Sequence, residues 1–312
     1  MTFSDLDALG KKREPFLFIS DFEAKTLKVF LPKDLQKENI YFSIDSNAKY
    51  MKHGLTLQTK PINFQAYKEK FDKIIQEIKA GNTYVLNLTQ ETPVELSVSL
   101  KEVFTKVNAP YKLYYKDEFV CFSPECFVKI SQNKIHTFPM KGTIDASIKD
   151  AKVKILADTK EMAEHIMIVD LLRNDLSIVA KEIKVEKFRF ISEIKSAKKT
   201  LLHVSSHISG KLEENWHENI GTILESILPA GSISGAPKKS TVEIIKTTEG
   251  YKRDFFSGVF GYYDGETLDS GVMIRFLQRS ENGYVYKSGG GITLDSVVSA
   301  EYQEIQDKIY LP

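Results

Sequence analysis

The chain has few cysteines and almost no net charge, which argues against several common classes of protein. Its 312 residues include only two cysteines, Cys121 and Cys126, and the formal net charge at pH 7 is +1. Two cysteines without a second pair or a histidine motif argue against a zinc site. A net charge near zero provides no overall field that would favour nucleic acid or an anionic membrane.

Long apolar runs are also missing. No stretch approaches the roughly 20 apolar residues that a transmembrane helix requires. Residues 1–7 lack a basic region followed by an apolar core, so they do not predict a signal peptide. We therefore expect a cytoplasmic protein with neither a membrane nor a nucleic acid as partner.

What is present predicts one continuous domain of mixed strands and helices. Apolar residues at helical spacing predict a helix from Phe64 to Ala80, ended by Gly81. Further helices are expected over residues 163–176, 217–228, 237–248 and 299–310. Strands are expected over residues 16–19, 26–30, 83–89, 201–212, 255–263, 271–278 and 284–288, with several more within 111–138. Because strands and helices do not alternate strictly, the pattern favours the α+β class.

Lys141 is the most unusual residue. It lies between the apolar Met140 and Gly142 at the exit of a strand-like stretch. A partly desolvated amine loses its proton more easily and can then attack carbon, so the segment predicts a nucleophile with a lowered pKa. The alternative is a strand-end lysine that reaches solvent.

Two pairs of glutamates repeat one spacing. Glu161 and Glu164 are three residues apart, as are Glu301 and Glu304, so each pair projects from one face of a helix. Like charges at this spacing destabilise an exposed helix, and hard oxygen ligands select magnesium. The alternative is two solvated helix faces. The apolar run 166–172 favours a first helix that is buried over most of its circumference.

Five segments in a fixed order carry a resemblance to a known family. They are residues 139–143, 161–175, 229–238, 274–275, and 289–296 leading to 301–304. Together they resemble the chorismate-utilising enzymes. The resemblance implies two large stacked antiparallel sheets with outer helices and an active site in the cleft between them. It also implies a short N-terminal strand region over residues 1–60, integrated into the fold, and a chorismate-binding catalytic domain over 61–312.

The resemblance also implies roles for individual residues. Lys141 would be the nucleophile, Glu125 the general acid for the departing ring hydroxyl, and His203 would lie beside the ring. Arg275, expected to point inward from a strand, would grip the enolpyruvyl carboxylate with support from Lys308. The implied substrate contacts are Gly142, Thr143, Ser234, Ile274, Arg275, Gly290, Gly291 and Lys308. Magnesium would be bound directly by Glu164 and Glu304, and its shell completed by Glu161 and Glu301.

The residues at positions 141 and 85 distinguish the branches of this family. A lysine at 141 resembles aminodeoxychorismate synthase component I, whereas anthranilate and isochorismate members usually have alanine there. Water-adding members carry a lysine where this chain has Val85, which argues against isochorismate and salicylate synthesis. We therefore expect chorismate and ammonia to yield 4-amino-4-deoxychorismate, on the path to 4-aminobenzoate and folate, through a covalent lysine intermediate.

The sequence also bears on the source of the ammonia and leaves two alternative functions. No cysteine–histidine glutaminase unit is visible in the sequence, so ammonia should come from a separate glutamine amidotransferase subunit or from solution. The alternative within the family is anthranilate synthase component I. An alternative of another class is a non-catalytic scaffold for the glutaminase, but a scaffold would need neither Lys141 nor the four glutamates.

Overall fold

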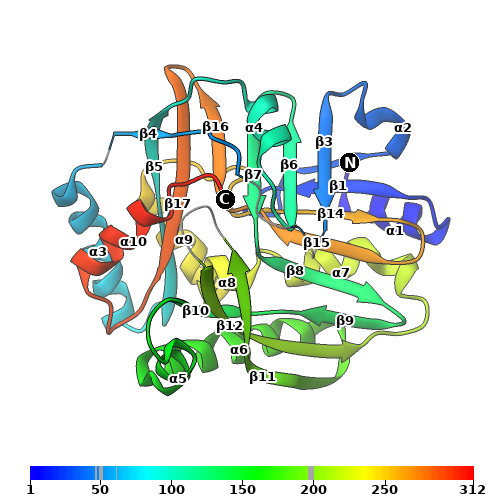
Figure 1. Cartoon of the computed structure of the whole chain (residues 1–312). Coiled ribbons are helices and arrows are strands. Elements are labelled where there is room, and N and C mark those ends of the chain that lie inside the picture. The colour runs from blue at the N-terminus through cyan, green and yellow to red at the C-terminus, as the bar shows by residue number, and fades with distance from the viewer. Residues whose placement is uncertain (46–47, 49–51, 61, 196–199) are drawn as a thin grey trace.

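The computed structural model describes residues 1–45, 48, 52–60, 62–195 and 200–312. Within this part of the chain there are two large antiparallel sheets (Figure 1). The nine strands of the first sheet are, in spatial order, β10 (Met140–Asp145), β12 (Thr200–Lys211), β9 (Lys134–Thr137), β8 (Cys126–Ser131), β15 (Leu268–Val272), β14 (Val259–Tyr263), β1 (Phe16–Ser20) and β2 (Leu27–Phe30), with β11 (Lys181–Lys195) paired to β12.

The second sheet has eight strands among the described residues. Their order is β13 (Gly235–Ala236), β5 (Val85–Glu95), β17 (Gly283–Ile292), β16 (Phe276–Ser280), β7 (Phe119–Ser123), β6 (Tyr111–Tyr115) and β3 (Ile40–Ile44), with β4 (Gln58–Thr59) paired to β5. The long β5–β17 pair places Thr89 opposite Gly289 and Asn87 opposite Gly291. This register fixes which residues of β5 lie beside the glycine-rich end of β17.

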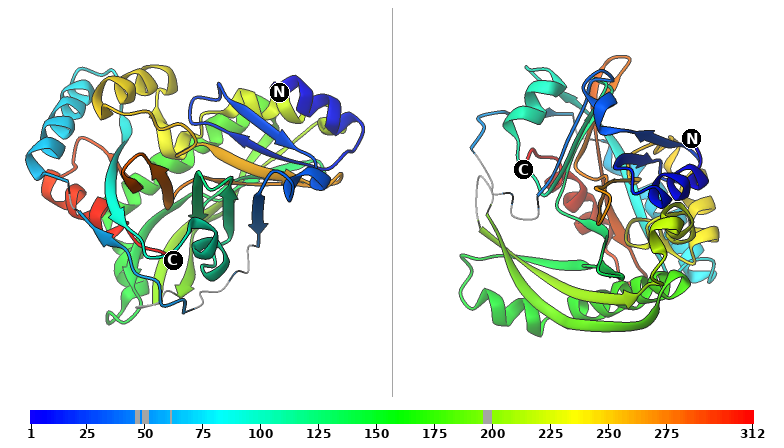
Figure 2. Two further views of the ribbon diagram at one scale, coloured as in Figure 1. Left: turned by 90° about the horizontal axis from the view of Figure 1, so that it is seen from above. Right: turned by 90° about the vertical axis from the view of Figure 1, so that its right-hand side faces the viewer.

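Helices cover the outer faces of both sheets. Figure 2 shows α3, α9 and α10 gathered beside β5 and β17, while α1, α6 and α7 lie together along the first sheet. The helices are α1 (Phe3–Lys11), α2 (Pro32–Leu35), α3 (Phe64–Lys79), α4 (Leu100–Lys106), α5 (Ala151–Ala157), α6 (Thr159–Val179), η1 (Trp216–Asn219), α7 (Ile220–Ile227), α8 (Gly231–Ser234), α9 (Lys238–Glu249) and α10 (Val298–Asp307). The predicted α+β class with two stacked sheets is confirmed.

Aromatic side chains fill the space between part of the two sheets. Leu17 and Phe260 from the first sheet pack with Phe119 and Phe276 from the second. The rings of Phe119 and Phe276 are stacked with centroids 4.6 Å apart. Burial of this apolar surface provides the main force that holds the sheets face to face.

Three sequence predictions are wrong in detail. Residues 271–278 do not form one strand but belong to β15 and β16, which lie in different sheets and are separated by residues 273–275. The expected strand at 255 begins only at Val259, because Asp254 and Ser257 have positive φ angles. Helix α6 is not buried over most of its circumference, since Ile166 is 50% exposed and Met167 38%.

No helix within the described residues is both long and apolar enough to cross a membrane. The boundary at residue 60 stays a prediction, although strands from both sides of it share the same sheets: β1 pairs with β14, and β3 pairs with β6.

Candidate active site

Two crossings between the sheets lie side by side and carry Glu125 and Arg275. The chain passes from β7 in the second sheet to β8 in the first through Glu125, and from β15 back to β16 through Arg275. The backbone N–H of Val272 donates to the Glu125 carbonyl at 3.1 Å, and that of Phe122 donates to the Arg275 carbonyl at 3.2 Å. The crossings therefore place a carboxyl group and a guanidinium group together between the sheets.

The Glu125 carboxyl group is held by a serine of the turn α8. Ser232 Oγ donates to Glu125 Oε1 at 2.5 Å. Burial raises the pKa of Glu125, and the Ser232 hydrogen bond and the charges of Arg275 and Lys308 only partly oppose this. A raised pKa suits a carboxyl group that donates a proton near neutral pH. Ser232 was not predicted as a site residue, although the two hydroxyl residues at 232 and 234 were a signal that could have pointed to it.

Arg275 does not lie on a strand, contrary to the prediction. It has a φ of 51°, and its guanidinium carbon lies 5.2 Å from the centroid of the Tyr310 ring. Its Nε is buried and has no hydrogen-bond partner among the described residues. A positive φ on a non-glycine residue is strained, and such strain is concentrated at functional sites. A guanidinium with a buried, unused donor is well suited to bind a carboxylate.

Lys308 joins the last helix to the glycine-rich strand. Its Nζ donates to the Gly289 carbonyl at 2.7 Å and pairs with Glu304 Oε1 at 2.6 Å. Burial lowers the pKa of Lys308, against the opposing effect of Glu304. A Cβ on Gly290 would lie 3.3 Å from Glu301 Oε2 and 3.6 Å from Glu304 Oε1. The glycine residues of β17 thus allow its backbone to lie close to the glutamates of α10.

Lys141 lies on β10 and faces α6. Its Nζ pairs with Glu164 Oε2 at 2.6 Å. Burial lowers the pKa of Lys141, but the carboxylates of Glu164, Glu304 and Glu161 outweigh burial, so the pKa is raised overall. The expected lowering of this pKa is wrong, because glutamates from both helices surround the amine. The structure does bring Lys141 together with the two glutamate pairs.

Gly142 leaves room for the side chain of Glu161. Its φ is 99°, and a Cβ there would lie 3.1 Å from Glu161 Oε2. That Glu161 oxygen is buried and has no hydrogen-bond partner among the described residues. A buried carboxylate oxygen without a donor is costly, so it indicates a missing partner.

The four glutamates offer the ligand chemistry that magnesium prefers. Burial raises the pKa of Glu161 and of Glu301, and a neighbouring glutamate adds to the rise in each case. In the described part of the chain, no three Asp, Glu, His or Cys side chains are gathered closely enough to hold a metal ion by themselves. Magnesium commonly takes only one or two protein carboxylates together with water and substrate oxygens. The donor set therefore fits magnesium, whose binding stays a prediction.

His203 lies on β12 opposite Thr143 of β10. Its Nδ1 is 3.3 Å from Thr143 Oγ1. Burial and the nearby charge of Arg275 lower the pKa of His203 to about 4. The imidazole is therefore neutral near pH 7, when it can accept or donate a hydrogen bond but carries no charge.

The low pKa of His203 predicts a specific dependence of stability on pH. An unfolded histidine binds a proton below about pH 6.5, whereas folded His203 does so only near pH 4, so stability is lost as pH falls between these values, by about 3 kcal/mol in total. His203→Gln should lack this part of the loss. Urea unfolding at about pH 7.5 and about pH 4.5 gives the loss of unfolding free energy for each protein. Other titrating groups contribute equally to both losses, so they cancel when the variant is compared with the parent. An equal loss in both proteins would contradict the prediction.

The remaining predicted substrate contacts lie around the same region. Ser234 is fully buried, and its Oγ donates to the Ala230 carbonyl at 3.0 Å, so its hydroxyl proton is already used. Ile274 is half-buried within the crossing that carries Arg275. A Cβ on Gly291 would contact Val85 Cγ2 at 4.0 Å. Their contacts with a substrate stay predictions.

The chain matches a family model described as chorismate binding enzyme over residues 25–311. It therefore belongs to the chorismate-binding enzyme family. It is 48% identical over 307 residues to a protein of Haemophilus influenzae described as an uncharacterized PabA-like protein, covering 97% of this chain and 94% of the relative. It is 33% identical over 261 residues to aminodeoxychorismate synthase component 1 of Escherichia coli, covering 78% of this chain but only 56% of that relative.

The fold also resembles solved structures. A protein of Bacillus anthracis, whose structure is described as that of a 2,3-dihydroxybenzoate-specific isochorismate synthase, superimposes with a TM-score of 0.74 at 18% identity, covering 98% of this chain and 87% of that one. Anthranilate synthase component I of Streptococcus pneumoniae gives a TM-score of 0.67 at 24% identity, covering 86% and 60%. At these identities the similarity establishes the shared fold.

Proposed function

We propose that this chain aminates chorismate to 4-amino-4-deoxychorismate, as an aminodeoxychorismate synthase component I. The observation that carries the proposal is Lys141, whose Nζ lies in the site 2.6 Å from Glu164. The scaffold function would need no such amine among carboxylates. The relative from Escherichia coli that bears this name supports the same choice.

The proposed reaction uses the residues in a fixed order. After losing a proton to solvent, the Lys141 amine attacks the ring carbon next to the one that bears the carboxylate. The two conjugated ring double bonds shift, and the allylic hydroxyl leaves as water with a proton from Glu125. Ammonia then adds at the carbon that carried the hydroxyl, the double bonds shift back, Lys141 is expelled as a free amine, and the new ammonium group returns a proton to Glu125.

The other residues hold the substrate. Arg275 would bind the enolpyruvyl carboxylate, and Lys308 would support it. Glu164 and Glu304, with Glu161 and Glu301, would hold magnesium near the ring carboxylate, where the ion would supply positive charge. Ammonia would come from a separate glutamine amidotransferase subunit or from solution.

Product analysis tests this function. The purified chain is incubated with chorismate, ammonium chloride and magnesium, and the products are separated and identified by mass. We expect 4-amino-4-deoxychorismate, which keeps the enolpyruvyl group, and no release of pyruvate. Anthranilate with stoichiometric pyruvate would establish the alternative. No turnover with ammonium, but turnover when a glutamine amidotransferase is added, would show that the partner activates the chain.

A further inference from the structure

A fully buried ion pair lies next to the turn α8 and strand β5, and the proposed reaction does not use it. Arg253 and Glu249 have side chains only 2% and 1% exposed, and Arg253 Nη2 lies 2.6 Å from Glu249 Oε1. Arg253 Nε also donates to Glu249 Oε2 at 2.8 Å. A buried ion pair adds little net stability compared with a well-packed apolar pair, so its presence calls for another explanation.

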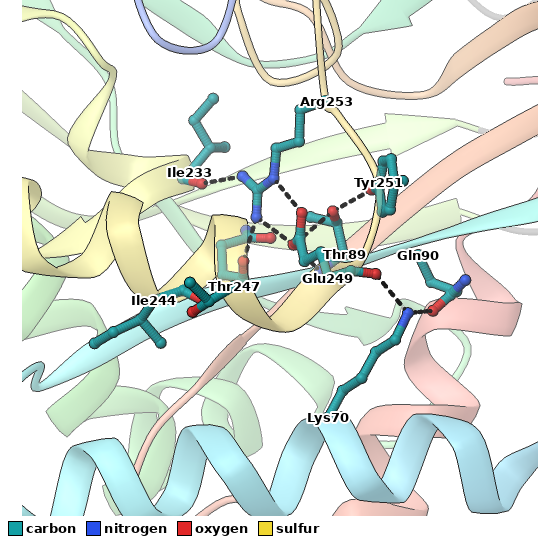
Figure 3. Close-up of polar contacts among 10 residues, drawn as sticks. Lys70, Thr89, Gln90, Ile233, Ile244, Thr247, Glu249, Tyr251 and Arg253 are labelled. Carbon is teal, nitrogen blue, oxygen red and sulfur yellow. Dashed lines mark hydrogen bonds and ion pairs between the residues drawn. The ribbon is translucent and has the colours of Figure 1, made fainter.

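The Arg253 side of the pair is bonded to two segments of the site. Nη1 donates to the Ile233 carbonyl in the turn α8 at 3.1 Å (Figure 3). Nη2 donates to the Asn87 carbonyl in β5 at 2.5 Å. Ile233 is the residue that follows Ser232, which donates to Glu125. The guanidinium therefore fixes the turn one residue from the serine that holds the proposed acid.

The Glu249 side of the pair is bonded to the same strand, β5, two residues beyond Asn87. Its Oε1 accepts the backbone N–H and the hydroxyl of Thr89, each at 2.7 Å. Thr89 is the β5 partner of Gly289, whose carbonyl accepts the Lys308 ammonium. Lys70 of α3 donates to the Glu249 carbonyl at 2.7 Å (Figure 3).

We propose that Arg253 and Glu249 are positioning residues, which fix the turn α8 against β5 and so keep Ser232 in its hydrogen bond with Glu125. An arginine suits this task because its planar fork makes four hydrogen bonds here, two to the carboxylate and two to carbonyls, whereas a lysine ammonium has only three donors. This inference rests on the proposed role of Glu125. It assigns the pair an effect on the proton-transfer step rather than on substrate binding.

We expect substitutions in this pair to lower kcat and to leave KM nearly unchanged. Glu125 would act when the hydroxyl leaves, whereas chorismate would be held mainly by Arg275 and Lys308. Arg253→Lys should therefore lower kcat about tenfold and change KM less than about threefold. Ser232→Ala should have the same pattern. Because both substitutions would break one chain of contacts, the double variant should be no slower than the slower single variant.

The experiment compares these variants with the full-length protein, by the rate of chorismate disappearance whatever the product. Arg13→Lys is the matched control, because Arg13 also donates to a backbone carbonyl, that of Gly265, outside the site. It should keep kcat within about twofold. If Arg253→Lys does not fold, Thr89→Val is used, since it removes one contact with Glu249 and keeps side-chain size; a several-fold fall in kcat is expected.

Two results would overturn the proposal. One is a folded Arg253→Lys or Thr89→Val protein with kcat within twofold of the parent. The other is a double variant whose loss is the product of the two single losses, which would show independent action. Amide hydrogen exchange of residues 231–234 without substrate gives a second readout and should be faster in Arg253→Lys. A different product with the same relative rates would refute the proposed function and keep this inference.

Discussion

Replacing Lys141 by alanine should lower the formation of 4-amino-4-deoxychorismate by about a thousandfold or more, because the substitution removes the proposed covalent nucleophile. Chorismate should still bind, since Arg275 keeps its position in the crossing and Lys308 its position directly after α10. With the amine gone, direct attack on the ring by ammonia or water becomes the remaining route. Products should therefore shift towards those of family members that carry alanine at this position.

The measurement combines product analysis with intact-protein mass spectrometry during turnover. Samples quenched with acid should contain a chorismate-derived adduct, and peptide mapping should place it on Lys141. Lys160→Ala is the matched control, because Lys160 also pairs with Glu164, at 3.7 Å, but its side chain is 55% exposed. That variant should keep both the adduct and the rate. Formation of 4-amino-4-deoxychorismate by Lys141→Ala at the parental rate would exclude covalent catalysis by this residue.

The sequence predicted the composition of the site better than its geometry. Spacing on helices identified both glutamate pairs, and the structure places Lys141 Nζ beside Glu164. The sequence could not show how closely the two glutamate pairs approach the amine, because α6 and α10 come together only through the two sheets. For that reason the direction of the Lys141 pKa was predicted wrongly.

The crossings between the sheets were the main feature of the fold that the sequence concealed. Residues 271–278 are rich in strand-forming residues, and no proline or glycine marks the break before Phe276. The chain bends there through a positive φ at Arg275, which a local pattern disfavours and only tertiary contacts can impose. Ser232 was missed for a related reason, since its partner Glu125 lies 107 positions away in the sequence.

Glu304→Gln should lower kcat/KM by about a hundredfold, and removal of magnesium from the parent protein should have at least as large an effect. Burial raises the pKa of Glu304, but Lys308 and Lys141 outweigh burial and lower it overall, so this carboxylate is charged and available to a cation near pH 7. The amide keeps the size of the side chain and loses the charge. The Lys308 bond to the Gly289 carbonyl does not depend on that charge, so the fold should be kept.

Asp307→Asn is the matched control, because it is the same change of acid to amide on the same helix, at an exposed side chain that contacts Gln303. Activity is measured with EDTA and after magnesium is restored. Thermal unfolding is followed with and without magnesium, first without and then with chorismate. Magnesium that binds the folded protein should raise Tm in the parent and in Asp307→Asn, and much less in Glu304→Gln. Since the described carboxylates do not form a complete metal site by themselves, the rise should be larger when chorismate is added. Full activity of the parent protein in EDTA would refute the magnesium site, and the four glutamates would then act only as the charged surroundings of Lys141.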